Sequence, residues 1–129
     1  MIDSRRHALR VHPGLYCICR LGPDEPTPVW TTLASFCSLT RTVDELSIVC
    51  NQEAVPPDVR AERNWRLLGV QGPLDLSMVG ILAGLATTLA TAGVSIFAIS
   101  TFDTDYLLVP DDDLHGTLDA LKEARYAVP

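Results

Sequence analysis

The chain has 129 residues, of which 47% are hydrophobic and 20% are charged, a composition that excludes a disordered or collagen-like protein. This length suits one domain or two very small units. The formal net charge of −6 and the pI near 4.8 argue against a nucleic-acid-binding surface. The negative charge lies in the second half, where residues 71–129 carry eight acidic residues against Lys122 and Arg125.

The first ten residues are polar and include Arg5, Arg6 and Arg10. They lack the apolar stretch of a signal peptide, so we expect a cytoplasmic protein. Because chain ends are rarely ordered, we expect this basic arm to be a frayed terminus.

The four cysteines lie in the first half of the chain, at Cys17, Cys19, Cys37 and Cys50. Cys17 and Cys19 are two residues apart in a predicted strand, so both point to one face. A cytoplasmic protein keeps its thiols reduced. Zinc sites use pairs of cysteines separated by two to four residues, and the sequence has no second pair. We therefore expect buried thiols that pack as small hydrophobic side chains, and no metal site.

The first half alternates short strands with loops. A proline-rich loop follows the first strand, and residues 29–34 leave room for barely two helical turns. A short helix is expected over residues 58–63. Strands are predicted over residues 15–21, 36–40, 46–50 and 66–71.

A run of 27 uncharged residues lies between Asp75 and Asp103. Gly93 interrupts the run, and a helix over residues 78–91 would be about 21 Å long, short of the ~30 Å hydrocarbon core of a bilayer. Lys and Arg do not flank the run, so we expect no membrane association. The pattern predicts a buried amphipathic helix and then a buried strand over residues 94–101. The helix's second face is small, which suits either tight packing on a sheet or contact with another chain.

Two segments match at an offset of 60 residues, 39–49 against 99–109. Each predicts strand, polar connection, acid and strand, which indicates two copies of one unit. The second copy continues with a helix over residues 111–124, where acids suit the helix start, and with a final strand over residues 126–128. Its order, β-α-β-β-α-β, is the ferredoxin-like arrangement.

The fold class that we predict is therefore α+β, with two ferredoxin-like units in tandem. Each unit has an antiparallel sheet with helices on one face, and the first unit has abbreviated helices. The expected units are residues 1–64 and residues 65–129.

Particular strings of this sequence resemble the small tandem ACT-domain proteins, a bacterial group whose ACT units look like those of the CASTOR arginine sensors. The match extends roughly from Leu15 to Tyr126. The strings are Gly72-Pro73-Leu74-Asp75-Leu76-Ser77, Gly80-Ile81-Leu82, residues 98–109 and residues 38–49.

This resemblance implies a regulatory module that binds an amino acid or a similar effector where two ACT units or two subunits meet. It implies one wall at the turn before the long helix and another at the following strand. The ligand-binding residues that it implies are Gly72, Pro73, Leu74, Asp75, Leu76, Ser77, Ile96, Phe97, Ala98, Ile99, Ser100 and Asp103.

The chemistry of the two walls suits an α-amino acid. Backbone N–H groups at a helix start near Leu76 and Ser77 would hold a carboxylate, and Asp75 or Asp103 would hold an ammonium group. Asp75 is equally well explained as the N-cap of the helix. Asp103 is explained as a hairpin turn residue, a ligand contact or, with Asp105, a metal ligand.

We expect no catalytic activity and no cofactor, because Ser100 and Thr101 have no histidine nearby in sequence to form a nucleophile–base pair. The predicted function is binding of a small amino-acid-like effector, in a homodimer. The alternative is a ligand-free homo-oligomerisation or protein-interaction module, which would use the small helix face and the sheet edges.

Overall fold

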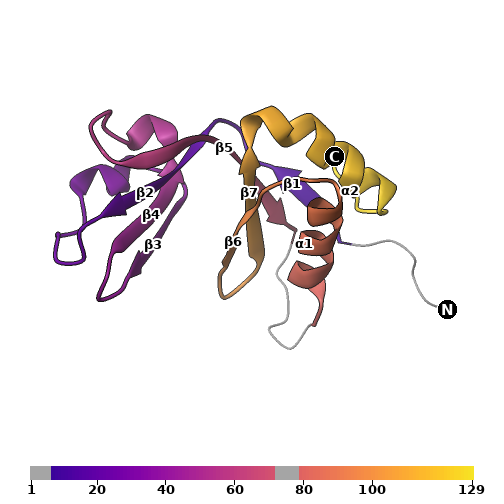
Figure 1. The fold of residues 1–129 in the computed structure, drawn as a ribbon, viewed down its shortest axis with the longest axis horizontal. Coiled ribbons are helices and arrows are strands. Elements are labelled where there is room, and N and C mark those ends of the chain that lie inside the picture. The colour runs from indigo at the N-terminus through magenta and orange to yellow at the C-terminus, as the bar shows by residue number, and fades with distance from the viewer. Residues whose placement is uncertain (1–6, 72–78) are drawn as a thin grey trace. The chain divides into compact units, whose positions relative to one another are not determined.

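The computed structural model describes residues 7–71 and 79–129. The chain divides into two compact units. We call Gly14–Trp65 the N-terminal unit, and Met1–Pro13 together with Arg66–Pro129 the C-terminal unit. Strand β5 (Ala61–Val70) begins in the first unit and ends in the second (Figure 1).

The N-terminal unit is an antiparallel sheet in the order β3-β4-β2-β5. Two short 3-10 turns, Val29–Leu33 and Gln52–Ala54, stand in the chain where a ferredoxin-like unit has its helices. Residues 61–63 belong to β5, so the short helix expected over residues 58–63 is wrong. The other strands are β2 (Tyr16–Leu21), β3 (Cys37–Arg41) and β4 (Leu46–Asn51).

The C-terminal unit contains the two α-helices of the described chain, and its strands follow the order β1-β5-β7-β6. Within the described residues, neither helix has the length and hydrophobicity that crossing a bilayer requires. The elements are β1 (Leu9–Val11), α1 (Ile81–Thr91), β6 (Phe97–Ser100), β7 (Asp105–Pro110), a 3-10 turn (Asp111–Asp113) and α2 (Leu114–Glu123).

The N-terminal arm is not frayed throughout, because β1 pairs with the end of β5. Leu9 lies opposite Val70 and is fully buried. The strand predicted over residues 126–128 is reduced to an isolated bridge between Ala127 and Ala8, in which the Leu9 N–H donates to the Ala127 carbonyl (2.8 Å). The arm therefore supplies the strand that borders β5 in this unit.

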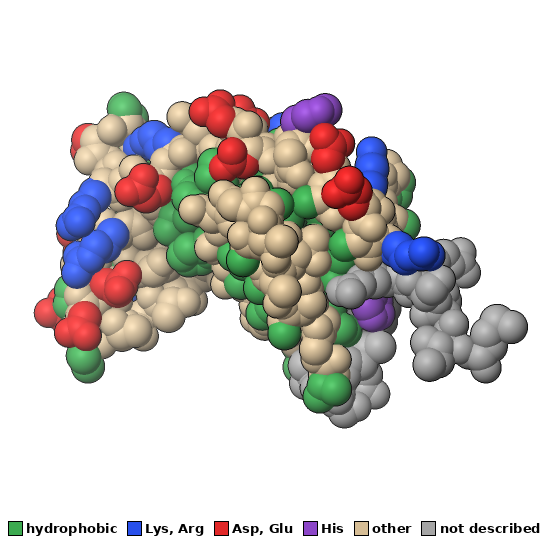
Figure 2. Space-filling view, turned by 45° about the vertical axis from the view of Figure 1, so that its right-hand side comes forward, with side chains coloured by type: hydrophobic (Ala, Val, Ile, Leu, Met, Phe, Trp, Pro, Cys, Tyr) green, Lys and Arg blue, Asp and Glu red, His purple; other side chains and the backbone are tan. Residues whose placement is uncertain are grey.

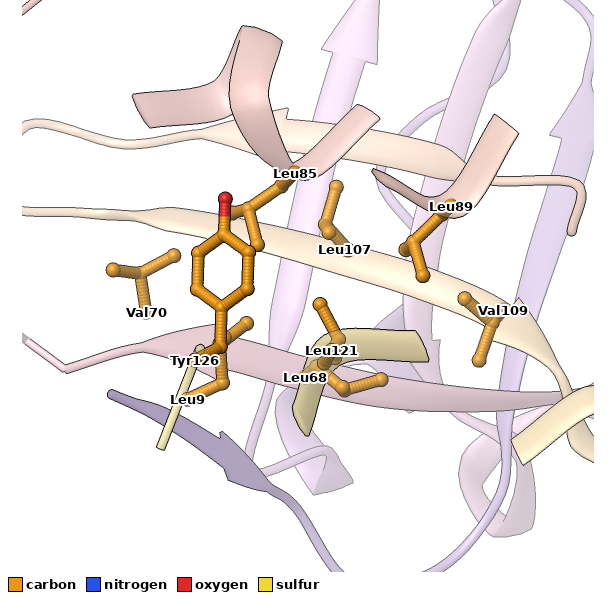
Figure 3. Close-up of a cluster of buried hydrophobic side chains, with 9 residues drawn as sticks. All are labelled: Leu9, Leu68, Val70, Leu85, Leu89, Leu107, Val109, Leu121 and Tyr126. Carbon is orange, nitrogen blue, oxygen red and sulfur yellow. The ribbon is translucent and has the colours of Figure 1, made fainter. Parts of the chain in front are cut away.

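The core of the C-terminal unit lies between one face of its sheet and the two helices (Figure 3). Leu85 and Leu89 are one helical turn apart on α1, so both point at the sheet. Alternate residues of each strand face them, since side chains of a strand alternate between faces. The buried cluster comprises Leu9, Leu68, Val70, Leu85, Leu89, Leu107, Val109, Leu121 and Tyr126.

Two expectations about the uncharged run are corrected. Helix α1 begins at Ile81, and its N-cap is Gly80 (φ 83°), so the expected helix start at Asp75 to Ser77 is wrong. Strand β6 is not buried, because it is the last strand in the order and pairs with β7 alone among the described strands. Its residues alternate between partly buried and exposed.

Both hairpins end in the same hydrogen-bonded turn, which corrects the repeat offset. The Thr42 N–H donates to the Glu45 carbonyl (2.9 Å), and the Thr101 N–H donates to the Thr104 carbonyl (2.8 Å). Thr42 and Thr101 are 59 residues apart, so the offset of 60 is one residue too large. A slip of one residue would exchange the two faces of a strand.

Both helices close with a Schellman motif, in which a residue in the left-handed region follows the C-cap. After α1 this residue is Gly93 (φ 77°), and after α2 it is Arg125 (φ 73°). The bonds are Gly93 N–H to Ala90 O (3.0 Å), Val94 N–H to Leu89 O (2.9 Å), Arg125 N–H to Lys122 O (3.0 Å) and Tyr126 N–H to Leu121 O (2.9 Å).

The same substitution should have opposite effects at two glycines. Gly93→Ala should lower the free energy of unfolding by about 1 kcal/mol, because alanine is strained at φ 77°. Gly116→Ala should raise it by about 0.5–1 kcal/mol, because Gly116 is an exposed residue inside α2 with open space around its Cβ position. Urea unfolding measures both, and equal effects of the two variants would contradict the assigned backbone geometry.

Candidate functional site

A cavity of about 620 Å³ opens in the C-terminal unit, at the end of β5. Arg10 lies opposite Gly69 in the β1–β5 pairing. Both alternate with the core residues Leu9, Leu68 and Val70, so they lie on the sheet face away from the helices. The lining residues are Arg10, His12, Gly69, Val70, Gln71, Asp103, Thr104 and Tyr106.

The floor of the cavity depends on Gly69. A Cβ at this position would lie 2.9 Å from Nε2 of His12 and 3.1 Å from the ring of Tyr106. The two rings lie above the glycine with centroids 6.0 Å apart and planes tilted by 53°. The absent side chain is therefore what lets an imidazole and a phenol ring lie together over β5.

One rim of the cavity is the turn between β6 and β7. The Thr104 hydroxyl donates to the Val70 carbonyl (2.6 Å), which ties the turn to the end of β5. The Ser100 hydroxyl donates to the Asp105 carboxylate (2.7 Å), so this acid is engaged within the hairpin. Asp103 stands at the exposed turn between them.

The cavity brings together charges of opposite sign. Across the described residues, neither the Arg10 guanidinium nor the Asp103 carboxylate has an ion-pair partner. Burial, and secondly the charge of Arg10, lower the pKa of His12, so its imidazole is neutral at pH 7. The Thr104 hydroxyl is held by a carbonyl and not by a base, an arrangement that suits binding better than nucleophilic catalysis.

The predicted site and this cavity share Asp103. Six predicted residues, Gly72, Pro73, Leu74, Asp75, Leu76 and Ser77, lie outside the described residues and directly follow the lining residue Gln71. Five others, Ile96, Phe97, Ala98, Ile99 and Ser100, lie on or just before β6 and do not line this cavity. Their ligand contacts stay predictions.

Sequence reasoning missed the aromatic and basic lining of the cavity. Arg10 and His12 were assigned to a frayed arm, although the apolar residues Leu9 and Val11 alternate with them as in a half-buried strand. Gly69 and Tyr106 carry the same signal, since each alternates with residues of the core. An alternation test on the arm would have placed Arg10 on a sheet face.

A second groove, of about 490 Å³, lies along α1 and α2. It exposes the small helix face noted in the sequence, and Glu123 is the charged group among its lining residues. Elsewhere on the surface, Figure 2 shows acidic and basic side chains interspersed on the face that it presents. The groove is lined by Thr87, Thr88, Thr91, Ala92, Ala120, Glu123 and Ala124.

Comparison with known proteins places the cavity within an ACT domain. Residues 60–123 match the family model of the ACT domain, and residues 14–58 match a second family model, of an N-terminal domain. Protein Atu0741 of Agrobacterium tumefaciens is 41% identical, with a TM-score of 0.90 over 96% of this chain and 92% of that one. The chain therefore belongs to the same family as that protein, and it contains an ACT domain.

Two more distant relatives are regulatory proteins by name. The human "Cytosolic arginine sensor for mTORC1 subunit 1" is 29% identical over 105 residues, which are 78% of this chain. The chain spans about a third (32%) of the length of that curated relative. The regulatory subunit of aspartate kinase from Thermus thermophilus shares the fold, with 13% identity and a TM-score of 0.63 over 91% of this chain and 97% of that one.

Filling the floor should reshape the cavity. Gly69→Ala should push the His12 and Tyr106 rings apart and lower the free energy of unfolding by about 1–3 kcal/mol, as overpacking does. NMR spectra should show displaced ring signals of both residues. Gly22→Ala is the matched control, because its Cβ would meet only Glu25 Cγ, at an ordinary 3.8 Å. Unchanged ring signals in Gly69→Ala would refute this description of the floor.

His12 should make folding sensitive to acid. Because its folded pKa is lowered from 6.5, the unfolded chain binds the proton more tightly. The His12 contribution to stability is therefore complete above about pH 6.5 and declines as the pH falls below that value. NMR titration should give a His12 midpoint below 6.5 that rises in Arg10→Gln.

The control for this titration is His115→Gln, an exposed position on α2. It should leave the His12 midpoint unchanged, whereas His12→Gln should flatten the acid limb of the unfolding free energy. A His12 midpoint at or above 6.5 in the unaltered chain would contradict the burial of this ring.

Proposed function

We propose that the chain is a non-catalytic regulatory module that binds a small amino-acid-like effector in the cavity above Gly69. The observation that carries the proposal is the pairing of Arg10 with Asp103 at the rim of one cavity in an ACT domain. An α-amino acid carries a carboxylate and an ammonium group, which these two side chains complement. The described lining offers no nucleophile activated by a base, which agrees with a binding module.

The proposed contacts follow from the donor inventory of each side chain. Arg10 binds the effector carboxylate through the two parallel N–H bonds that a guanidinium can donate. Asp103 accepts the ammonium protons. The neutral His12 imidazole and the Tyr106 ring contact the effector side chain, and they allow it to be apolar or aromatic without a charge conflict.

The predicted residues Gly72–Ser77 would complete this site. They begin one residue beyond Gln71, so we propose that their backbone forms a second wall beside the Arg10–Asp103 rim. The β6 residues 96–100 would then contact the effector from a neighbouring ACT unit or a second subunit. These assignments rest on the family resemblance together with the position of Gln71.

The regulatory effect would come from a shift in association. A ligand that binds one assembly state better than another shifts the equilibrium by its difference in affinity. We propose a cytoplasmic homodimer of tandem ACT units, residues 1–64 and 65–129. The N-terminal unit supports this division, because its strands follow the ferredoxin-like order with 3-10 turns in place of helices. The arginine-sensor and kinase-regulatory relatives support an amino-acid effector.

The second candidate is a ligand-free homo-oligomerisation module. Strand β6 ends the strand order of its unit, and the α1–α2 groove has mostly small side chains that allow another backbone to approach closely. A free strand edge pairs readily with a second strand. This candidate needs no guest in the cavity.

A thermal-shift screen with the twenty amino acids tests the effector proposal. An effector at about 100 times its Kd should stabilise the chain by about 2.7 kcal/mol. Arg10→Gln and Asp103→Asn should each weaken its affinity at least about tenfold, or ~1.4 kcal/mol, because each removes a charge that the effector contacts. Isothermal titration calorimetry measures the affinities.

Asp112→Asn is the matched control, since Asp112 is an exposed acid outside the cavity. It should bind the effector as the unaltered chain does. If no amino acid stabilises the chain while sedimentation shows a dimer, the second candidate replaces the first. Equal loss of affinity in all three variants would attribute binding to net charge and not to the cavity.

A further inference from the structure

The four thiols of the N-terminal unit lie on one face of its sheet. The strand pairing places Cys17 opposite Cys50, and Cys50 opposite Cys37, and residues directly opposite share a face. Cys19 is two residues beyond Cys17 and shares that face as well. Cys17, Cys19 and Cys50 are buried, whereas Cys37 is exposed on β3, the last strand in the order of this unit.

Cys37 and Cys50 occupy the closest kind of cross-strand position. The Thr42 N–H to Glu45 carbonyl bond marks that pair as hydrogen-bonded, and the two kinds of pair alternate along a hairpin. Counting back through the register makes Cys37–Cys50 a non-hydrogen-bonded pair, with Cα atoms about 4.5 Å apart and side chains closest. That separation lies within the roughly 4.4–6.8 Å that a disulfide spans.

Cys17 is less well placed for the same reaction. The Gln52 N–H donates to the Leu15 carbonyl (2.9 Å), so the adjacent alternation makes Cys17–Cys50 a hydrogen-bonded pair with Cα atoms about 5.5 Å apart. Its thiol is fully buried and accepts a hydrogen bond from the Arg63 guanidinium (3.8 Å). An oxidant in solvent therefore reaches Cys37 before it reaches Cys17.

We propose that Cys37 and Cys50 form a reversible intramolecular disulfide when a hydroperoxide reaches the exposed edge of the N-terminal unit. The Cys37 thiolate attacks the peroxide, breaking the O–O bond and giving a sulfenic acid and an alcohol, or water when the oxidant is hydrogen peroxide. The Cys50 sulfur then displaces the sulfenic oxygen, which leaves as water. Two thiols together lose two electrons and two protons, and a dithiol reductant returns them.

The proposed reaction is a slow one. Burial raises the pKa of Cys37, so only a small fraction of this thiol is ionised at neutral pH. A hydrogen bond with Cys19, together with burial, raises the pKa of Cys50. The disulfide thus forms under sustained oxidation, and it joins the edge strand β3 to its neighbour β4.

Peptide mapping of the full chain tests the proposal directly. The reduced protein is treated with hydrogen peroxide in the presence of a chelator, alkylated while denatured, and cleaved with trypsin. Arg20, Arg41 and Arg60 place Cys37 on peptide 21–41, Cys50 on peptide 42–60, and Cys17 with Cys19 on peptide 11–20. The expected result is loss of half of the thiol titre and a link between peptides 21–41 and 42–60 that dithiothreitol reverses.

Three variants accompany the mapping. Cys37→Ser, at an exposed position, and Cys50→Ala should each abolish the link, and Cys17→Ala is the control that should keep it. Mapping of the unaltered chain decides the matter if Cys50→Ala fails to fold. A link from peptide 11–20 to peptide 42–60, a disulfide-bonded dimer through Cys37, or over-oxidised Cys37 without a link would overturn the proposal.

Discussion

The packing of two helices on a single sheet face is the constraint on which the C-terminal unit depends. Leu85 and Leu89 of α1 and Leu121 of α2 require apolar partners at every second position of the strands beneath them. The positions in between are thereby directed to the opposite face. Arg10, His12 and Tyr106 gather there because the core has already claimed their neighbours, so the location of the cavity is a by-product of how the core alternates.

The charge pattern of the cavity is set more locally than its location. The Thr104 hydroxyl fixes the β6–β7 turn to the Val70 carbonyl, and this single 2.6 Å bond decides where the turn residue Asp103 stands. Arg10, by contrast, is positioned by backbone pairing of β1 with β5. The two charges that would hold a zwitterion thus depend on two independent sets of hydrogen bonds, and a change in one leaves the other in place.

Sequence patterns predicted the elements whose signals are local. Strands β2, β3, β4 and β7 and the end of α1 at Gly93 follow from alternation and from a turn-forming glycine. The long helix began later than expected, because Gly80 and not Asp75 precedes it. The ACT domain was identified from its strings, and Asp103 was the predicted residue that the structure places in the cavity lining.

What the sequence left open depends on partners distant in the chain. Strand β1 is three residues long, and only its pairing with β5, some 60 residues away, makes it a strand. The cavity floor requires Gly69, His12 and Tyr106 together, and no local pattern joins residues so far apart. The burial of three cysteines and the exposure of the fourth likewise follow from strand order and not from spacing.

The two threonine turns impose a rule on any exchange of parts between the halves. Aligning the halves by similar letters pairs Thr42 with Phe102, whereas aligning them by their hydrogen bonds pairs Thr42 with Thr101 and Asp44 with Asp103. A hairpin transplanted by the first alignment would turn its apolar residues toward water and its polar residues inward. A chimera cut at the threonines would keep both faces, which makes the backbone bond and not the residue match the guide for grafting.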